Sequence, residues 1–448
     1  MEGEFRRALG PWSAGALIAG SIIGVGIFLF VADVAARLPS GPAILAVWTA
    51  GAVVASCGSL CLAELAAAYP QTGGIYVFLR RAYGPFVAFL YSWAKLLITR
   101  PGSFAILALG FARFAGDFLG LGADAPPWMG KAMAVGAVVA LTGINIVGVR
   151  AGAGVQNVLT AIKVLCLAAV IGVGAAFAAG ALGAHPVAIQ AAEAPTGSAI
   201  LLFGTALVAV MWAFGGWDEA PFVAEEVRQP ERNLPLAILG GLWLTAVLFV
   251  AVNAAYLAIL SPAELAASGG QTALVAMQRA LGGGAGRMLS LALMISALGA
   301  ANGLALTGGR IAFATGRDQP LFRWFARTHP ATKTPVRGLV LQAVLTIAVM
   351  LALPNPFQLL LYTGLAYWAF AGLTALAVIV LRRREPGRER PFRVWAYPVV
   401  PVLFAAASAG MGLSVALTSP RNALAAVVIL AVGAAAFAVQ ALCFRERE

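Results

Sequence analysis

Twelve apolar stretches, each close to the length of a membrane-crossing helix, constrain the fold of this chain more than any other feature. A helix needs about 20 apolar residues to cross the hydrocarbon of a bilayer. The stretches lie near residues 14–36, 43–69, 86–112, 129–147, 155–178, 200–227, 236–260, 287–314, 336–353, 357–381, 396–418 and 421–443. Only 11% of the residues are charged, against about 25% in soluble proteins, whose surfaces need that charge. The sequence therefore predicts an all-α integral membrane protein with about 12 transmembrane helices.

The distribution of basic residues predicts the orientation of these helices. With the N-terminus in the cytoplasm, 21 of the 30 lysines and arginines fall in inner segments, six in outer segments and three within spans. Cytoplasmic links of membrane proteins carry such an excess. We therefore predict a multi-pass protein of the cell (plasma) membrane with both termini in the cytoplasm. The net charge of +12 is divided among short links and forms no single patch, which argues against nucleic acid as a partner.

Two spans carry glycine where a continuous helix would not tolerate it, and the sixth span carries proline as well. The first span contains GSIIGVGIF at 20–28, and the sixth contains WAFGGWDEAP at 212–221. Glycine destabilises a helix interior by about 1 kcal/mol and proline by about 3 kcal/mol relative to alanine. Unpaired backbone at membrane depth is tolerated where it lines a cavity or is buried in protein. Glycine can also serve close helix packing alone, but breaks in spans one and six are expected for two five-helix halves of inverted topology.

This span order predicts the domain organisation. We expect a cytoplasmic N-terminus at 1–13, a ten-helix transport core at 14–381, a basic cytoplasmic loop at 382–395, two accessory helices at 396–443 and a cytoplasmic C-terminus at 444–448. The halves of the core fall at about 14–178 and 200–381. The two halves show no clear residue-level repeat, so the inverted repeat is inferred from the order of the spans.

The two breaks predict a binding site for a zwitterion near the midplane. The N-terminus of a half-helix offers donors to a carboxylate, and unwound carbonyls offer acceptors to an ammonium group. An amino acid is therefore the expected substrate. The predicted substrate-binding residues are Ile22, Ile23, Gly24, Val25, Gly26, Trp212, Ala213, Phe214, Gly215 and Asp218.

Seven segments match one transporter family in their order and spacing. They read GSIIGVGIF at 20–28, AELAAAYPQTGGIYVFLRRAYG at 63–84, RPGSFAILAL at 100–109, VQNVLTAIKVLCLA at 155–168, FGGWDEAPFVAEEVRQPERNLPLAI at 214–238, SALGAANGLALTGGR at 296–310 and HPATKTPVRGL at 329–339. Together they resemble the amino acid–polyamine–organocation (APC) superfamily, and within it the L-type amino acid transporters and their bacterial relatives. The resemblance implies a LeuT-like fold with broken helices 1 and 6. It also implies secondary active, sodium-independent amino acid transport by alternating access, through proton-coupled symport or exchange.

The resemblance also implies specific roles for three residues, one of which is the predicted substrate-binding residue Trp212. Trp212 matches an aromatic gate. Lys163 matches a lysine that takes the place of a sodium ion, with the Ser296 hydroxyl and carbonyls near Ile22 as its partners. A lysine within a span is functional by default, although a long side chain can also reach the interface by snorkelling.

Two departures from the family pattern bear on the substrate. Val25 stands where the family usually has serine, so one hydroxyl near the substrate carboxylate is missing. Asp218 stands where the L-type branch has an amide, and an acidic residue there resembles transporters of cationic amino acids or polyamines, which is the alternative function. Asp218 could equally cap the half-helix that follows it, since aspartate is a good N-cap.

Several other partners and activities are not expected. The link at 113–128 has no cysteine, so we expect no disulfide-linked heavy chain of the kind that eukaryotic L-type transporters have. Neither histidine lies in a span and no metal-site or nucleotide-binding motif is present. We therefore expect a transporter and not an enzyme, with no cofactor and no metal. The sequence leaves the oligomeric state and the roles of Lys95 and Arg100 unassigned.

Overall fold

The computed structural model describes residues 9–121, 126–185, 196–282, 285–353 and 355–444, which are almost entirely helical. Ten helical segments in this part of the chain are long and apolar enough to cross a membrane. Two shorter apolar helices, α10 (Ala199–Ala213) and α15 (Val336–Ala352), complete the twelve. The prediction of an all-α membrane protein with about twelve helices is confirmed.

In the described part of the chain, the first five spans and the links between them contain nine α-helices and one π-helical turn. Span 1 is divided between α1 and α2, span 3 contains the π-helical turn η1, and α5 lies in the link between spans 2 and 3. The elements are α1 (Pro11–Ile22), α2 (Gly26–Leu29), α3 (Val31–Ala35), α4 (Gly41–Ala68), α5 (Ile75–Tyr83), α6 (Pro85–Ala94), η1 (Lys95–Thr99), α7 (Arg100–Leu119), α8 (Pro127–Val147) and α9 (Val149–Ala178).

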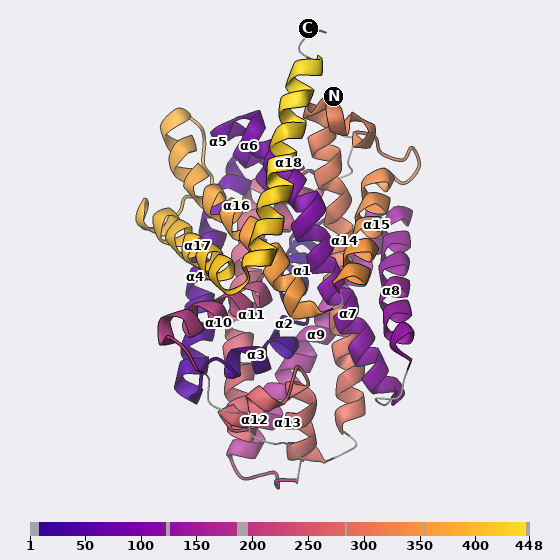
Figure 1. The fold of residues 1–448 in the computed structure, drawn as a ribbon, viewed down its shortest axis with the longest axis vertical. Helices are drawn as coiled ribbons and strands as arrows, with labels where there is room; N and C mark the ends of the chain where they lie inside the picture. The colour runs from indigo at the N-terminus through magenta and orange to yellow at the C-terminus, as the bar shows by residue number, and fades with distance from the viewer. Residues whose placement is uncertain (1–8, 122–125, 186–195, 283–284, 354, 445–448) are drawn as a thin grey trace.

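The remaining spans follow the same plan, with span 6 divided like span 1. After α10 the elements are η2 (Ala220–Glu226), α11 (Pro230–Ile259), α12 (Pro262–Ala267), α13 (Thr272–Leu281), α14 (Ala285–Asp318), η3 (Pro320–Phe325), α15, α16 (Pro356–Arg384), α17 (Val399–Thr418) and α18 (Pro420–Phe444). In Figure 1 the short helices α12 and α13 lie at one end of the long axis, and α5 and the last turns of α18 lie at the other.

Polar caps explain where several helices begin. The Ser261 hydroxyl and the Glu264 side chain form a capping box at the start of α12. At the start of α16, Asn355 accepts hydrogen bonds from the amides of Phe357 and Gln358 at 2.9 and 3.2 Å. In the link between spans 7 and 8, the hydrogen bond from Arg279 lowers the pKa of the Glu264 carboxyl to about 2 and connects α13 to α12.

The surface of the bundle is apolar and its interior holds charge, the reverse of a soluble protein. Leu165 and Val247, on spans 5 and 7, are 69% and 70% exposed. The buried charged side chains include Lys95, Arg100, Lys163, Asp218 and Glu219. Lipid solvates the apolar exterior, while each interior charge needs a partner within the protein.

The basic segment predicted as a loop at 382–395 is bound to the end of span 2, although its first three residues continue α16. Arg382 donates to both carboxylate oxygens of Glu64 at 2.8 and 2.6 Å, and Arg388 donates to the Ala68 carbonyl at 2.7 Å. Both acceptors lie in the last turns of α4. These bonds hold the end of α16 against α4. They also give the buried Glu64 carboxylate its hydrogen-bond donors.

Span 1 lies at the centre of the bundle. α1 packs against α9, α11 and α14, while α2 packs against α10 of span 6. In Figure 1, α1 and α2 are surrounded by the longer helices. The two interrupted spans therefore meet inside the protein, where lipid does not reach the open backbone.

Candidate functional site

The break predicted in span 1 is present between α1 and α2. Helical geometry stops at Ile22 and resumes at Gly26, so residues 23–25 lie outside both helices. Among the described residues, the amides of Val25, Gly26 and Ile27 donate no backbone hydrogen bond. The carbonyl of Gly24 accepts a hydrogen bond from the Ser296 hydroxyl at 3.1 Å. The break therefore leaves consecutive N–H groups available to an anionic group.

The break predicted in span 6 follows α10. Residues 214–219 form turns before the 3₁₀ helix η2. The carbonyls of Ala213, Phe214 and Gly215 accept no backbone hydrogen bond from the described part of the chain. Such carbonyls can accept hydrogen bonds from an ammonium group.

Glycine is required where the two broken spans cross. A Cβ atom at Gly26 would lie 2.7 Å from the Cα of Ala213. Gly216 has a φ of +110°, and a Cβ there would lie 2.7 Å from the carbonyl carbon of Ser21. Only glycine adopts this φ readily and leaves this approach open.

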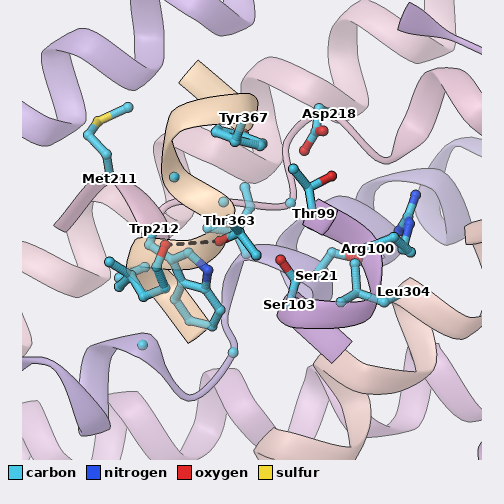
Figure 2. Close-up of a pocket in the computed structure, with 18 of the residues that line it drawn as sticks. Ser21, Thr99, Arg100, Ser103, Met211, Trp212, Asp218, Leu304, Thr363 and Tyr367 are labelled. Atoms are coloured by element: carbon cyan, nitrogen blue, oxygen red, sulfur yellow. Dashed lines mark hydrogen bonds between the residues drawn. The ribbon is translucent and has the colours of Figure 1, made fainter. Parts of the chain in front are cut away.

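A cavity of about 80 Å³ lies between the two breaks. Seven of the ten predicted substrate-binding residues line it, namely Ile22, Gly24, Gly26, Trp212, Ala213, Gly215 and Asp218. Spans 3, 8 and 10 complete the wall with residues that the sequence did not single out, including Thr99, Ser103, Leu304, Thr363 and Tyr367. Figure 2 shows Asp218 and Thr99 on one side of the view, Trp212 on the other, and Tyr367 between them.

The three remaining predicted residues do not line the cavity. The Phe214 ring packs in the core against Trp48 and Phe249, with centroids 6.1 and 5.2 Å apart. Ile23 and Val25 are fully buried among apolar side chains. Their peptide groups belong to the breaks, so only a backbone role remains open to them.

Trp212, expected as an aromatic gate, begins a series of ring contacts toward the start of α16. Its ring meets Phe30 edge to face at 5.1 Å, and Phe30 meets Phe357 at 6.5 Å. The guanidinium of Arg37 lies 4.8 Å from the Phe357 ring. This series of aromatic contacts connects the cavity to the region around Arg37, just after α3.

Span 3 is distorted beside the cavity because of its proline. Pro101 has no N–H to donate to the carbonyl of Leu97, and the helix widens into the π-helical turn η1. The Tyr362 hydroxyl from span 10 donates to that carbonyl at 3.5 Å. The turn directs Lys95, Thr99 and Arg100 toward the cavity.

The four charged side chains of the cavity form two buried ion pairs. Lys95 donates to Asp218 at 3.0 Å, and Arg100 donates to Glu219 at 2.8 Å. The Thr307 hydroxyl also donates to Glu219. The pairs join span 3 to span 6 and balance two positive charges against two negative ones.

The capping role considered for Asp218 is wrong. η2 begins at Ala220 after Glu219, and no side chain caps it. The Asp218 carboxylate is bound to Lys95, because a buried charge gains more from an opposite charge than from an amide. Two bases in span 3 and two acids after the span 6 break were a sequence signal for this pairing.

Lys163 and Ser296 both contact the backbone of span 1. Lys163 is 1% exposed, so it does not snorkel to the interface. Its Nζ donates to the Gly20 carbonyl at 2.6 Å, two residues before the expected Ile22. A Cβ at Gly299 would lie 2.5 Å from the lysine Cε, so glycine in span 8 makes room for the ammonium group. With Ser296 on the Gly24 carbonyl, the two side chains bind the last turn of α1 and the break that follows it.

Comparison with known proteins agrees with this architecture. A family model described as amino acid permease matches residues 9–433. This chain belongs to the amino acid permease family. The permease is 32% identical to the b(0,+)-type amino acid transporter 1 of Mus musculus over 403 residues, which are 89% of this chain and 81% of that protein.

Two further relatives of this permease are similar over most of their length. The serine/threonine exchanger SteT of Bacillus subtilis is 29% identical over 405 residues, 90% of each chain. The large neutral amino acids transporter small subunit 2 of Rattus norvegicus is 31% identical over 401 residues, 89% of this chain and 74% of that protein. The predicted APC superfamily membership is confirmed, and the permease is a multi-pass membrane transporter and not an enzyme.

Proposed function

We propose that this permease transports small neutral amino acids, without sodium, by exchange or proton-coupled symport at the cavity between the two breaks. The observation that carries this is a cavity between amides and carbonyls that have no backbone hydrogen-bond partner in the described part of the chain, with its four charged side chains already paired. A zwitterion with an uncharged side chain leaves that balance intact. By the positive-inside rule, both termini are proposed to lie in the cytoplasm.

The size of the cavity supports a small substrate. A volume of about 80 Å³ holds roughly five to eight atoms the size of a water molecule, which needs about 10–15 Å³. Alanine, serine and threonine fall in this range. The name of the Bacillus subtilis relative, a serine/threonine exchanger, agrees with this size.

The cationic alternative has less support than the sequence suggested. A second ammonium on the substrate would need a free carboxylate, and Asp218 and Glu219 are both bound to basic residues of span 3. A cationic amino acid or a polyamine would therefore enter a cavity without an available counter-charge. Burying an uncompensated charge is costly.

The first test is the requirement for both backbone groups of the substrate. Serine and threonine at 100 times their dissociation constants should stabilise the purified permease by about 2.7 kcal/mol. Ethanolamine lacks the α-carboxylate and 3-hydroxypropionate lacks the α-amine. Each should stabilise the permease far less, because the amides of one break or the carbonyls of the other are left without a partner. Thermal unfolding with each ligand measures this, and ethanolamine stabilising the permease as much as serine would overturn the proposal.

The second test concerns sodium and Lys163. Uptake into proteoliposomes should be unchanged when choline replaces sodium. Lys163→Ala should insert normally but transport roughly ten- to a hundredfold more slowly, since a charge-assisted hydrogen bond contributes about 1.5–3 kcal/mol. Lys163→Arg should rescue poorly because its guanidinium is larger.

The exposed outer lysine Lys131 offers the matched control, and Lys131→Ala should transport like the wild type. Strict sodium dependence of the wild-type permease would contradict the assignment. Full activity of Lys163→Ala would show that the lysine only fills space.

A further inference from the structure

The ammonium group of Lys95 lies in a cation site formed by side chains of spans 6 and 10. Its Nζ is 3.0 Å from a carboxylate oxygen of Asp218 and 5.7 Å from the ring centroids of both Phe222 and Tyr367. A carboxylate beside two aromatic rings is a favourable environment for an alkylammonium ion in general. Nothing in this geometry requires that the ammonium belong to the protein.

This cation site borders the substrate cavity. Lys95, Thr99, Asp218 and Tyr367 line both the main cavity and a second cavity of about 20 Å³. The second cavity has room for about one or two water molecules, and among the described residues the Tyr91 hydroxyl in its wall has no hydrogen-bond partner. Because Lys95 lies in the wall of both cavities, truncation of its side chain would enlarge the space beside Asp218.

We propose that Lys95 is a specificity-determining residue that occupies a cation subsite with its own ammonium group and so excludes amino acids with cationic side chains. This rests on the proposed function, in which the two breaks hold the substrate's α-amino and α-carboxylate groups beside Asp218. A tethered group competes at an effective concentration far above that of a free substrate. Without Lys95, Asp218 would be a buried carboxylate without its partner, and a cation on the substrate could take the place of the Lys95 ammonium group.

A purely structural role for the Lys95–Asp218 pair makes a different prediction. If the pair only held span 3 against span 6, its loss would weaken binding of all ligands alike. The proposed subsite instead predicts a new preference for positive charge on the substrate side chain. The preference must also depend on Asp218, whose carboxylate is the partner of that charge.

Arginine and citrulline test this preference, because they have similar lengths and differ in the charge of the terminal group. In Lys95→Ala, arginine should bind at least tenfold more tightly than citrulline, as measured by thermal-stabilisation titration of the full-length protein. The wild type should show no preference for arginine. The double variant Lys95→Ala/Asp218→Asn, with the same added space but no carboxylate, should lose the preference again.

Equal binding of arginine and citrulline by Lys95→Ala would overturn the proposal, as would a preference for arginine in the wild type. If Lys95→Ala is poorly folded, arginine added during purification should raise the yield of monodisperse protein at least severalfold and citrulline should not; no difference between them would also overturn it. Failure of the proposed function has another signature, namely wild-type protein that neither serine nor threonine stabilises.

Discussion

Gly216→Ala is expected to lower amino acid uptake by about a hundredfold without preventing membrane insertion. Alanine at a φ of +110° stores about 1–3 kcal/mol of backbone strain. Its Cβ would also lie 2.7 Å from the carbonyl carbon of Ser21 and 3.0 Å from the amide nitrogen of Ile22. All of these are backbone atoms, so no side-chain rotation relieves the contact.

The consequence follows from where this contact lies. Span 1 must move away from span 6 at the point where both line the cavity, and the free amides and carbonyls no longer face one substrate. A misplacement of about 1 Å in such a site can cost about a hundredfold in rate. Initial uptake rates in proteoliposomes, normalised to inserted protein, measure the effect.

Gly172→Ala is the matched control for this prediction. Gly172 lies in span 5, and a Cβ there would meet no atom within 4 Å. Alanine is the better helix former by about 1 kcal/mol, so this variant should be as stable and active as the wild type. Near-normal uptake by Gly216→Ala would show that the crossing of the two breaks is not needed for transport.

Breaking the Arg100–Glu219 pair is expected to destabilise the permease by about 3–5 kcal/mol, because the remaining charge is buried alone. The two side chains are 1% and 2% exposed. Glu219 also accepts from Thr307, so its loss loosens spans 3, 6 and 8 together. Arg100→Met and Glu219→Gln should each lower the thermal unfolding midpoint in detergent.

The double variant separates charge burial from packing. Arg100→Met/Glu219→Gln removes both charges of this pair and leaves neither buried alone, so it should be more stable than either single variant. Substitution of the Arg80–Asp318 pair, with exposures of 49% and 25%, should cost less than about 1 kcal/mol. If the Arg100 and Glu219 variants were as mild as these, the pair would not hold the cavity together.

The sequence predicted the helices well because each membrane span can be recognised from a short stretch of consecutive residues. Backbone groups in lipid must pair within a helix, so each run of apolar residues corresponds to one span. The breaks were equally visible, since repeated glycines in the middle of a span have few uses at membrane depth, and in span 6 acidic residues and a proline follow them. Helical geometry stops after Ile22 and after Ala213, within the two segments that the sequence marked.

The composition of the cavity could be predicted only in part. The residues from spans 1 and 6 were found because the breaks identify them. Thr99, Thr363 and Tyr367 come from spans 3 and 10, and no local pattern distinguishes them from other polar residues of membrane helices. Conversely, Phe214 lies in the predicted segment but packs on Trp48, because the turn after α10 directs its ring to the core.

The amino-acid sequence by itself determined the number of spans, the two interruptions and the presence of charge at membrane depth, because each depends on residues close together in the chain. The partners of those charges were decided by the tertiary structure. Asp218 is bound to Lys95, 123 residues away, rather than to the adjacent helix. The physical reason is that a π-helical turn at Pro101 and a bend after Ala213 bring opposite charges together away from water. There, pairing at 3.0 Å is worth more than any local hydrogen bond.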